Sequence, residues 1–410
     1  MEAPPGWAAQ LGGTMAALGD SGDVPFRRRI LVLFGTRPEI IKLAPVIRTL
    51  ELRSSDYEIL NVSSGQHAQL LETFTRDLSV RVDRDLVVGT PGQTPNEIVR
   101  RVLEGLEPII LAWGPDAILV QGDTSTALAG ALAGFHAGVP VGHVEAGLRS
   151  DDLMSPFPEE MNRRLISRLA SFHFAATSHN LETLLEEGVS RDWIALTGNP
   201  VVDSVNWAME RLEVSPRLGE IISQVEERKI LLLTTHRRES FGEAMEERMR
   251  VLGEFVDQHP DVALVFPVHP NPEVQERAKR LLGEREGVFL VPPLGYADFI
   301  HLLANSWLIV SDSGGIQEET PSLGRPLLLI RENTERPEAI ESGLVRLVTD
   351  PGSALREALE GALEESGWMR DLKAIPNPFG QGDAGEKIGD ALMQLLAAKD
   401  AERTRGSGSS

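Results

Sequence analysis

Three charged side chains come directly after apolar runs in the first half of the chain. Arg37 follows the run that ends at residue 34, Asp123 the run that ends at 120, and Glu145 the run that ends at 144. Carboxylates can act as general acids or bases, and an arginine can bind an anionic group. Each residue alone is commonly a helix cap or a loop ion pair. The same placement three times favours a shared site.

A small-residue turn follows an apolar run in the second half of the chain. Ser313, Gly314 and Gly315 come after the run that ends at residue 310, and a helical pattern begins behind them. Such a turn leaves backbone N–H groups at the positive end of a helix dipole, which suits a diphosphate. Glu319, one turn further on, is placed to accept hydrogen bonds from ribose hydroxyls. An ordinary glycine-rich turn is the plain alternative.

Two histidines have the same placement as the charged residues. His236 comes after the run 230–233, and His269 comes after the run 262–265 and Phe266. A single loop histidine is commonly a structural residue, but the shared position at the ends of runs favours a role at the site.

The elements that must position these residues are short strands alternating with helices. We predict buried strands at 30–34, 57–62, 117–120, 139–144, 172–176 and 194–196, and in a second series at 230–233, 262–265, 288–291, 308–310 and 327–330. Such runs separated by helical patterns are typical of parallel βαβ units. The sequence therefore predicts an α/β protein with two doubly wound, Rossmann-like domains. In open sheets of this kind ligands bind beyond the carboxyl ends of the strands.

The two series also divide the chain. We expect a flexible leader at 1–28, a first domain at 29–203, a second domain at 204–372, a closing C-terminal helix at 373–400 and a flexible tail at 401–410.

Composition excludes several classes of protein. The 410 residues carry 61 acidic and 40 basic side chains, a formal net charge of −21, which argues against nucleic-acid or anionic-membrane partners. There is no cysteine, so disulfides, thiolate metal sites and a cysteine nucleophile are excluded. No apolar stretch is long enough to span a membrane, and no secretory signal is evident. We expect a soluble cytoplasmic protein.

Common cofactor and nucleophile motifs are missing from the sequence. No G-x-G-x-x-G follows the first strand, and there is no P-loop, no H-E-x-x-H metal spacing and no serine nucleophile elbow. We therefore expect neither a cofactor nor a metal.

Seven motifs together resemble the non-hydrolysing UDP-N-acetylglucosamine 2-epimerases. They lie, in order, at 34–39, 121–124, 142–149, 158–163, 236–239, 312–319 and 334–338. The resemblance spans about residues 29 to 396. It implies a glycosyltransferase-B type fold with two domains facing a cleft, a homodimer, a UDP-sugar substrate and a role in cell-envelope polysaccharide synthesis.

The resemblance also implies a mechanism and its residues. The family eliminates UDP across C1–C2 in anti fashion, forms 2-acetamidoglucal, and adds UDP back with the proton on the other face. By motif, Asp123, Glu145 and Glu159 handle protons and His236 assists near the diphosphate, with the face served by each carboxylate left open. The positions that match UDP contacts are Arg37, Lys42, His269, Phe299, Ser313, Gly314, Gly315, Glu319 and Arg336.

Some positions depart from the family pattern. Gln121 stands where a histidine is common, and Leu294 where a glutamine is common. Bacterial members are often activated by UDP-GlcNAc in a second pocket, for which Gln66, Gln69 and Arg237 are the possible residues here. Position 92, often arginine, is a glycine, so activation is expected to be weak or absent.

Other functions remain open at this point. A hydrolysing epimerase that releases ManNAc and UDP, or a retaining glycosyltransferase, would use the same fold. A nucleotide-sugar sensor without turnover would need only the phosphate-binding half, so Asp123, Glu145 and Glu159 argue against it.

Overall fold

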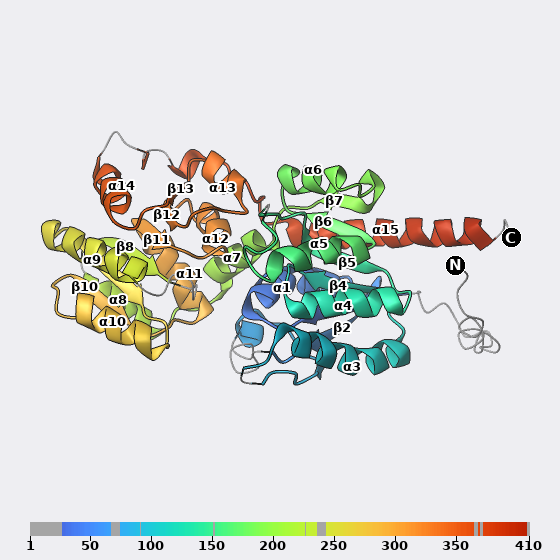
Figure 1. The fold of residues 1–410 in the computed structure, drawn as a ribbon. Helices are drawn as coiled ribbons and strands as arrows, with labels where there is room; N and C mark the ends of the chain where they lie inside the picture. The colour runs from blue at the N-terminus through green and yellow to red at the C-terminus, as the bar shows by residue number, and fades with distance from the viewer. Residues whose placement is uncertain are drawn as a thin grey trace.

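The computed structural model describes residues 27–66, 74–90, 92–150, 152–225, 227–235, 243–364, 368–369 and 372–407. Two parallel sheets, each covered by helices, form two lobes that lie side by side (Figure 1). Helix α7 (Pro200–Arg211) lies between the lobes and packs against elements of both.

The first lobe contains a seven-stranded sheet in the order β3-β2-β1-β4-β5-β6-β7. Its strands are β1 (Arg28–Phe34), β2 (Tyr57–Ser63), β3 (Arg84–Asp85), β4 (Ala117–Gln121), β5 (Val141–Ala146), β6 (Phe172–Ala175) and β7 (Ile194–Leu196). Its helices are α1 (Arg37–Leu52), α3 (Pro95–Trp113), α4 (Ser125–His136), α5 (Glu159–Leu169), α6 (Ser178–Glu186) and the short 3₁₀ helix η1 (Arg191–Trp193).

The second lobe contains a six-stranded sheet in the order β10-β9-β8-β11-β12-β13. Its strands are β8 (Lys229–Thr234), β9 (Val262–Pro267), β10 (Val288–Val291), β11 (Leu308–Ser311), β12 (Leu327–Ile330) and β13 (Val345–Val348). Its helices are α8 (Pro216–Val225), α9 (Glu243–Gln258), α10 (Pro272–Leu282), α11 (Tyr296–Asn305), α12 (Ile316–Ser322), α13 (Pro337–Glu341) and α14 (Ser353–Leu363), followed by η3 (Leu372–Ala374).

Alternate residues of the central strand β1 enter two different cores. Ile30, Val32 and Phe34 pack with α1, whereas Leu31 and Leu33 pack with α3 and α4. This alternation follows from the two-residue period of a strand whose two faces are both covered. The chain therefore leaves the neighbouring strands β1 and β4 toward opposite faces, and a crevice opens between their carboxyl ends.

The second sheet has the same crevice between β8 and β11. Helix α9 follows β8 and contributes Met245 and Phe255 to the core on one face of the sheet. Helix α12 follows β11 and contributes Ile316 to the core on the other face. Each sheet thus has a crevice at the carboxyl ends of its strands, which is where ligands bind in open sheets of this kind.

The last helix, α15 (Ala384–Ser407), returns to the first lobe and packs on α1. Asp203 of α7 accepts hydrogen bonds from the amides of Ala384 and Gly385 at 3.2 and 3.0 Å, which fixes the start of α15. Tyr57 donates its hydroxyl to the carbonyl of Gly389 at 2.7 Å. Figure 1 shows α15 extending past the first lobe toward the C-terminus.

Some element boundaries differ from those expected. The expected domain boundary at 203/204 falls inside α7, because Asn199 caps this helix and Pro200 begins it. The closing helix begins at Ala384 rather than 373, and it continues through Ser407 into the segment expected to be a tail. Residues 401–405 are Ala-Glu-Arg-Thr-Arg, and alanine, glutamate and arginine favour helix continuation. Strands β3 and β13 were not predicted, because β3 has two exposed residues and β13 a mixed polar pattern.

No helix within the described ranges is both long and apolar enough to cross a membrane.

Two buried histidines face each other across β5 and β6. His143 and His173 are register partners, and the Nε2 atom of His143 lies 2.7 Å from the carbonyl oxygen of Gly122. Burial lowers the pKa of His143 to about 3 and that of His173 to about 4. Both side chains are therefore neutral in the folded protein at physiological pH.

We predict that His143 makes the fold sensitive to acid. The unfolded chain binds a proton at this residue below about pH 6.5, but the folded chain does not until about pH 3, so the free energy of unfolding falls as the pH falls through this window. Between pH 7 and pH 5, the free energy of unfolding measured in urea should fall by about 2 kcal/mol less for His143→Gln than for wild type. His136→Gln, an exposed histidine, is the control, and equal slopes for wild type and His143→Gln would contradict the prediction.

Candidate active site

A buried lysine joins the two lobes at the facing edges of their sheets. Lys42, on α1 of the first lobe, forms an ion pair with Glu145 at the end of β5 and another with Glu318 of α12, the latter at 2.7 Å. All three side chains are buried. Arg336 of the second lobe donates from Nε to Glu318 at 2.5 Å, so two cations neutralise this pair of carboxylates.

The backbone at Glu145 is unusual for a strand residue. Its φ angle is +64°, in the left-handed region, and the pairing of β5 with β6 shifts register between Val144 and Ala146. An extra residue of this kind is a β-bulge, which turns a side chain away from the direction that the strand would give it. The bulge aims Glu145 at Lys42, and strained backbone of this kind is concentrated at functional sites.

The two carboxylates differ in their affinity for protons. Burial raises the pKa of Glu145 to about 7; the Lys42 charge opposes this rise, and the Glu318 charge adds to it. Burial would also raise the pKa of Glu318, but Arg336 and Lys42 outweigh it and hold that pKa well below its usual range. Near neutral pH, Glu145 can therefore exchange a proton while Glu318 stays ionised, which suits acid–base chemistry.

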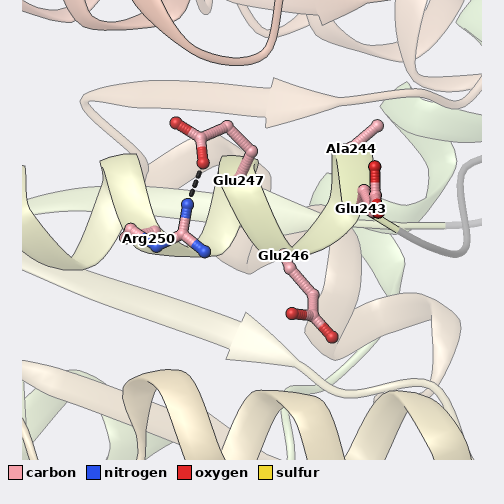
Figure 2. A pocket seen from close by; sticks show the side chains of 5 residues that line it. All are labelled: Glu243, Ala244, Glu246, Glu247 and Arg250. Carbon is pink, nitrogen blue, oxygen red and sulfur yellow. Dashed lines mark hydrogen bonds and ion pairs between the residues drawn. The ribbon is translucent and has the colours of Figure 1, made fainter.

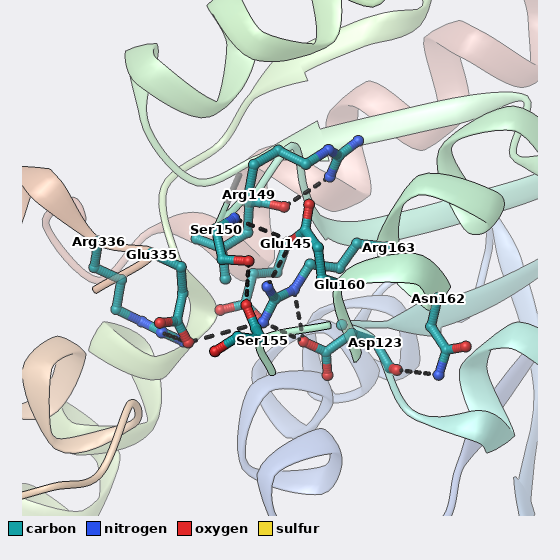
Figure 3. A network of polar contacts seen from close by, with 12 residues as sticks. Asp123, Glu145, Arg149, Ser150, Ser155, Glu160, Asn162, Arg163, Glu335 and Arg336 are labelled. Atoms are coloured by element: carbon teal, nitrogen blue, oxygen red, sulfur yellow. Dashed lines mark hydrogen bonds and ion pairs between the residues drawn. The ribbon is translucent and has the colours of Figure 1, made fainter. Parts of the chain in front are cut away.

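A second ion-pair network holds Asp123 (Figure 3). Arg163 of α5 contacts Oδ2 of Asp123 with Nε and Nη2, at 2.8 and 2.7 Å, and Glu160 with Nη1 at 3.0 Å. Its Nη2 also lies 3.8 Å from Glu335 of the second lobe. Asn162 donates to the carbonyl oxygen of Asp123 at 2.8 Å. The carboxylate of Asp123 is therefore fixed from one side by α5.

Glu335 links this network to the first one. It pairs with Arg336 at 2.7 Å and with Arg331 at 3.0 Å. Burial would raise the pKa of Glu335, but the charges of Arg336, Arg331 and Arg163 lower it. Charged residues of both lobes thus form one continuous layer around Glu145 and Asp123.

The turn after β1 is built by Glu39 and Gly35. The carboxylate of Glu39 accepts hydrogen bonds from the amides of Gly35 and Thr36 at 3.0 and 2.8 Å and from the Thr124 hydroxyl at 2.8 Å. A Cβ atom at Gly35 would lie 2.0 Å from Oγ of Ser64, so only glycine fits there. Burial raises the pKa of Glu39 to about 7, although its hydrogen bonds oppose the rise.

Arg37 lies on the exposed side of this turn. Its guanidinium carbon lies 5.4 Å from the ring centre of Phe74. Its charge opposes the burial that raises the pKa of Glu319 to about 7. Arg37 and Glu319 thus face the same region from opposite lobes.

The small-residue turn lies at the carboxyl end of β11, as expected. The amide of Ser313 donates to Oγ of Ser311 at 3.0 Å, and Gly315 precedes α12. A Cβ atom at Gly315 would meet nothing within 4 Å, whereas one at Gly314 would lie 3.1 Å from Arg336. Open space next to Gly315 leaves room for a ligand that approaches the backbone.

The remaining expected residues have contacts elsewhere in the two lobes or lie outside the described ranges. His269 accepts a hydrogen bond from the amide of Asn271 at 3.1 Å, and Phe299 packs half-buried on the core. Glu159 is the first residue of α5. Gln66 accepts from the Thr126 hydroxyl at 3.1 Å. His236, Arg237 and Gln69 lie outside the residues that the structure describes.

A separate hollow of about 540 Å³ lies along the first turns of α9 (Figure 2). It is lined by Glu243, Ala244, Glu246, Glu247 and Arg250. Glutamates predominate, and Arg250 already pairs with Glu247, so this surface does not suit an anionic diphosphate. Among the described residues there is no group of three or more histidines and carboxylates that could hold a metal ion.

Several residues of the candidate site were not predicted from the sequence. Three of them lie within the motifs described above: Glu318, Arg163 and Glu335. A motif alone does not tell which of its side chains point into the site, because helix and loop geometry decides this. Asn199, which donates to Glu145 at 3.2 Å, carried no sequence signal except its position before Pro200 as a helix cap.

Comparison with known proteins identifies the family. The family described as UDP-N-acetylglucosamine 2-epimerase matches residues 50–393. The chain belongs to this family. It is therefore an enzyme, an epimerase, and the resemblance inferred from the motifs is confirmed.

Relatives cover nearly all of the epimerase chain. The UDP-N-acetylglucosamine 2-epimerase of Escherichia coli K12 is 42% identical over 369 residues, which are 89% of this chain and 98% of the relative. A structure from Neisseria meningitidis bound to UDP-GlcNAc has a TM-score of 0.81 at 37% identity and covers 89% of this chain and 100% of its own. The S. aureus MnaA–UDP co-structure has a TM-score of 0.83 at 37% identity, with 90% and 97% covered. The expected fold, two Rossmann-like lobes of the glycosyltransferase-B type, is confirmed.

We predict that Lys42 is needed for stability as well as for the site. Lys42→Met would leave Glu145 and Glu318 buried without their shared cation, which typically destabilises by about 3–5 kcal/mol. The pKa of the carboxylates would rise, so the folded variant would bind protons that the unfolded chain does not. Its stability deficit in urea unfolding should therefore be smaller at pH 6 than at pH 7.5.

Lys387→Met is the control for this prediction, because Lys387 pairs with Asp383 in an exposed position at 3.0 Å. It should change stability by less than about 1 kcal/mol. A deficit of Lys42→Met that is absent, or equal at both pH values, would show that the bridge does not hold the two carboxylates.

Proposed function

We propose that the enzyme reversibly interconverts UDP-N-acetylglucosamine and UDP-N-acetylmannosamine by inverting C2 of the sugar. Related proteins carry the name UDP-N-acetylglucosamine 2-epimerase, and structures from Neisseria meningitidis and Methanocaldococcus jannaschii contain UDP-GlcNAc. The observation that carries the proposal is the cluster of Glu145, Lys42, Glu318 and Arg336 between the two facing sheet edges. It combines a carboxyl group of raised pKa with cations that suit a departing diphosphate.

The proposed reaction is an elimination followed by an addition. A base removes the proton from C2, the C2–H electron pair forms the C1–C2 double bond, and UDP leaves from C1 with the electrons of the C1–O bond. The product is 2-acetamidoglucal. A proton is then added to the opposite face of C2 while a β-phosphate oxygen of UDP bonds to C1. No redox cofactor is required, because the addition restores the C2 proton and the C1–O bond that the elimination removes.

The residues divide between the two tasks. Proton transfer is proposed for Asp123, Glu145 and Glu159. Arg163 holds the carboxylate of Asp123 in place, and Glu145 has a pKa suited to proton exchange. Lys42 and Arg336 would stabilise the negative charge that develops on the leaving UDP.

The other UDP contacts are proposed from the second lobe and from the turn after β1. They are Arg37, His269, Phe299, Ser313, Gly314, Gly315 and Glu319, with His236 near the diphosphate.

The reaction in D2O tests the proposal against the two alternatives. Purified enzyme with UDP-GlcNAc should give UDP-ManNAc, and NMR should show deuterium at C2 of both sugars. Free ManNAc with an equal amount of UDP would instead establish a hydrolysing epimerase. Transfer of the sugar to an added acceptor, with C2 protonated throughout, would establish a glycosyltransferase.

We predict that each proposed proton-handling carboxylate is essential for turnover. Asp123→Asn, Glu145→Gln and Glu159→Gln should each lower kcat by about 10²-fold or more, because general acid–base groups contribute about 10²–10⁴-fold. UDP affinity, measured by calorimetry, should change little. Glu104→Gln, an exposed carboxylate of α3, is the control. A variant with near-normal kcat would remove that residue from the mechanism.

We also propose that the enzyme is a homodimer. An exposed apolar stripe supports this proposal: Phe157, Met161 and Leu165 follow one another at four-residue spacing and are 62%, 39% and 44% exposed. Met161 and Leu165 lie on one face of α5, and Phe157 lies just before this helix begins at Glu159. Exposed apolar surfaces of this kind are commonly covered by a partner.

We predict that a charge in this stripe separates the dimer. Leu165→Asp should sediment as a monomer at concentrations at which wild type is a dimer, because a buried unpaired carboxylate disfavours association. Leu52→Asp, a charge at an exposed leucine at the end of α1, should leave the dimer intact. A monomeric wild type, or a dimeric Leu165→Asp, would contradict the proposed interface.

Weak activation through Gln66, Gln69 and Arg237, a cytoplasmic location and a role in cell-envelope synthesis remain predictions from the sequence.

A further inference from the structure

Both carboxylate oxygens of Glu145 accept hydrogen bonds from buried amide side chains. Nδ2 of Asn199 donates to Oε1 at 3.2 Å, and Nε2 of Gln121 donates to Oε2. Asn199 and Gln121 are 2% and 3% exposed. Lys42 also bonds Oε1, but it is shared with Glu318, so the two amides are the donors that serve Glu145 alone.

Each amide is held in place by its own backbone surroundings. Gln121 is the last residue of β4 and pairs in register with Val144, next to Glu145. Asn199 caps α7, because its Oδ1 accepts from the amide of Val201 at 3.1 Å. Since the oxygen of Asn199 is used by the cap, its nitrogen must face Glu145, and the orientation of the amide is determined.

Asn199 also connects Glu145 to the chain that returns from the second lobe. Its backbone amide donates to the carbonyl oxygen of Phe379 at 2.8 Å. Asn377, two residues earlier, donates to Oγ of Ser322 at the end of α12 at 3.0 Å. A run of hydrogen bonds therefore leads from α12, which carries Glu318, through this segment to the cap of α7.

The backbone of Glu145 makes such support necessary. With a φ of +64° inside a bulge, its side chain is not oriented by the regular packing of a strand. A reacting carboxylate must be held to within a fraction of an ångström, because a misplacement of about 1 Å can lower the rate about 10²-fold.

We propose that Asn199 and Gln121 are positioning residues that hold the carboxylate of Glu145 in its reactive orientation. The inference rests on the proposed epimerase function and assigns roles to two residues outside its proton-handling and UDP-binding sets. The amides act through Glu145 and do not touch the substrate. Because they are uncharged, they orient Glu145 at any pH without adding a titrating group.

The charged groups that face Glu145 are Lys42 of α1, Glu318 of α12 and Arg336 before α13. Against this fixed background, loss of an amide donor should raise the pKa of Glu145, because a hydrogen bond to a carboxylate favours its ionised form.

Two variants test the proposal. Asn199→Asp keeps an oxygen for the cap of α7 but replaces the donor with a carboxylate, and Gln121→Met removes the other donor without adding charge. Both should lower kcat about 10- to 100-fold with KM changed less than about threefold. In both, the pKa of Glu145 should rise by about one unit or more, measured by NMR with ¹³C-labelled glutamate and assigned by its absence in Glu145→Gln.

Asn61→Asp is the matched control. Asn61 is a buried asparagine of β2 that donates to Glu51 at 3.5 Å. Its replacement should lower stability but leave the pH profile of kcat and the titration of Glu145 unchanged.

The outcomes separate this inference from the proposed function. If wild type epimerises its substrate but neither variant changes kcat or the pKa of Glu145, the positioning role is wrong and the function stands. The role is also wrong if Asn199→Asp and Gln121→Met lose activity only in proportion to a lowered melting temperature, as Asn61→Asp would. If wild type shows no epimerisation, the proposed function is wrong, and the titration of Glu145 alone decides whether the amides hold it.

Discussion

The ion pairs of the Lys42 ammonium group are the interaction on which the candidate active site depends. Two carboxylates from different lobes, those of Glu145 and Glu318, come together in a buried region, where the charge of each would disfavour ionisation of the other. A lysine between them allows both to be buried and leaves Glu145 able to exchange a proton. The same ion pairs therefore connect the two lobes and influence the pKa of Glu145.

Much of the fold follows from the sequence, because buried parallel strands produce apolar runs that are easy to recognise. The runs at 30–34 and 117–120 became β1 and β4, and the residues behind them lie at the crevice where these strands separate. The placement of Asp123 and Glu145 near one another was thus predictable from topology alone. Strand β3 could not be predicted, because its two residues are exposed and form no apolar pattern. Such a strand is defined only by its pairing with a neighbour.

The inner layer of the site could not be predicted for a different reason. Glu318 and Glu319 are adjacent and chemically identical, yet one pairs with Lys42 and the other faces Arg37. Rotation along a short helix decides this, and the sequence does not encode it in any local signal. Asn199 is harder still, because its partner Glu145 is 54 residues away and the contact depends on a bulge.

The return of α15 to the first lobe has a consequence for how the protein is made. The groove on α1 that α15 covers belongs to the first 199 residues, but α15 begins only at Ala384. A ribosome that adds about 5–20 residues per second needs roughly 10–40 s to synthesise the intervening 200–383. During that interval the nascent first lobe exposes the apolar surface that Ile388, Leu392 and Leu396 will later bury. The first lobe therefore lacks part of its core until α15 is made, and it completes its packing only after the whole second lobe has been synthesised.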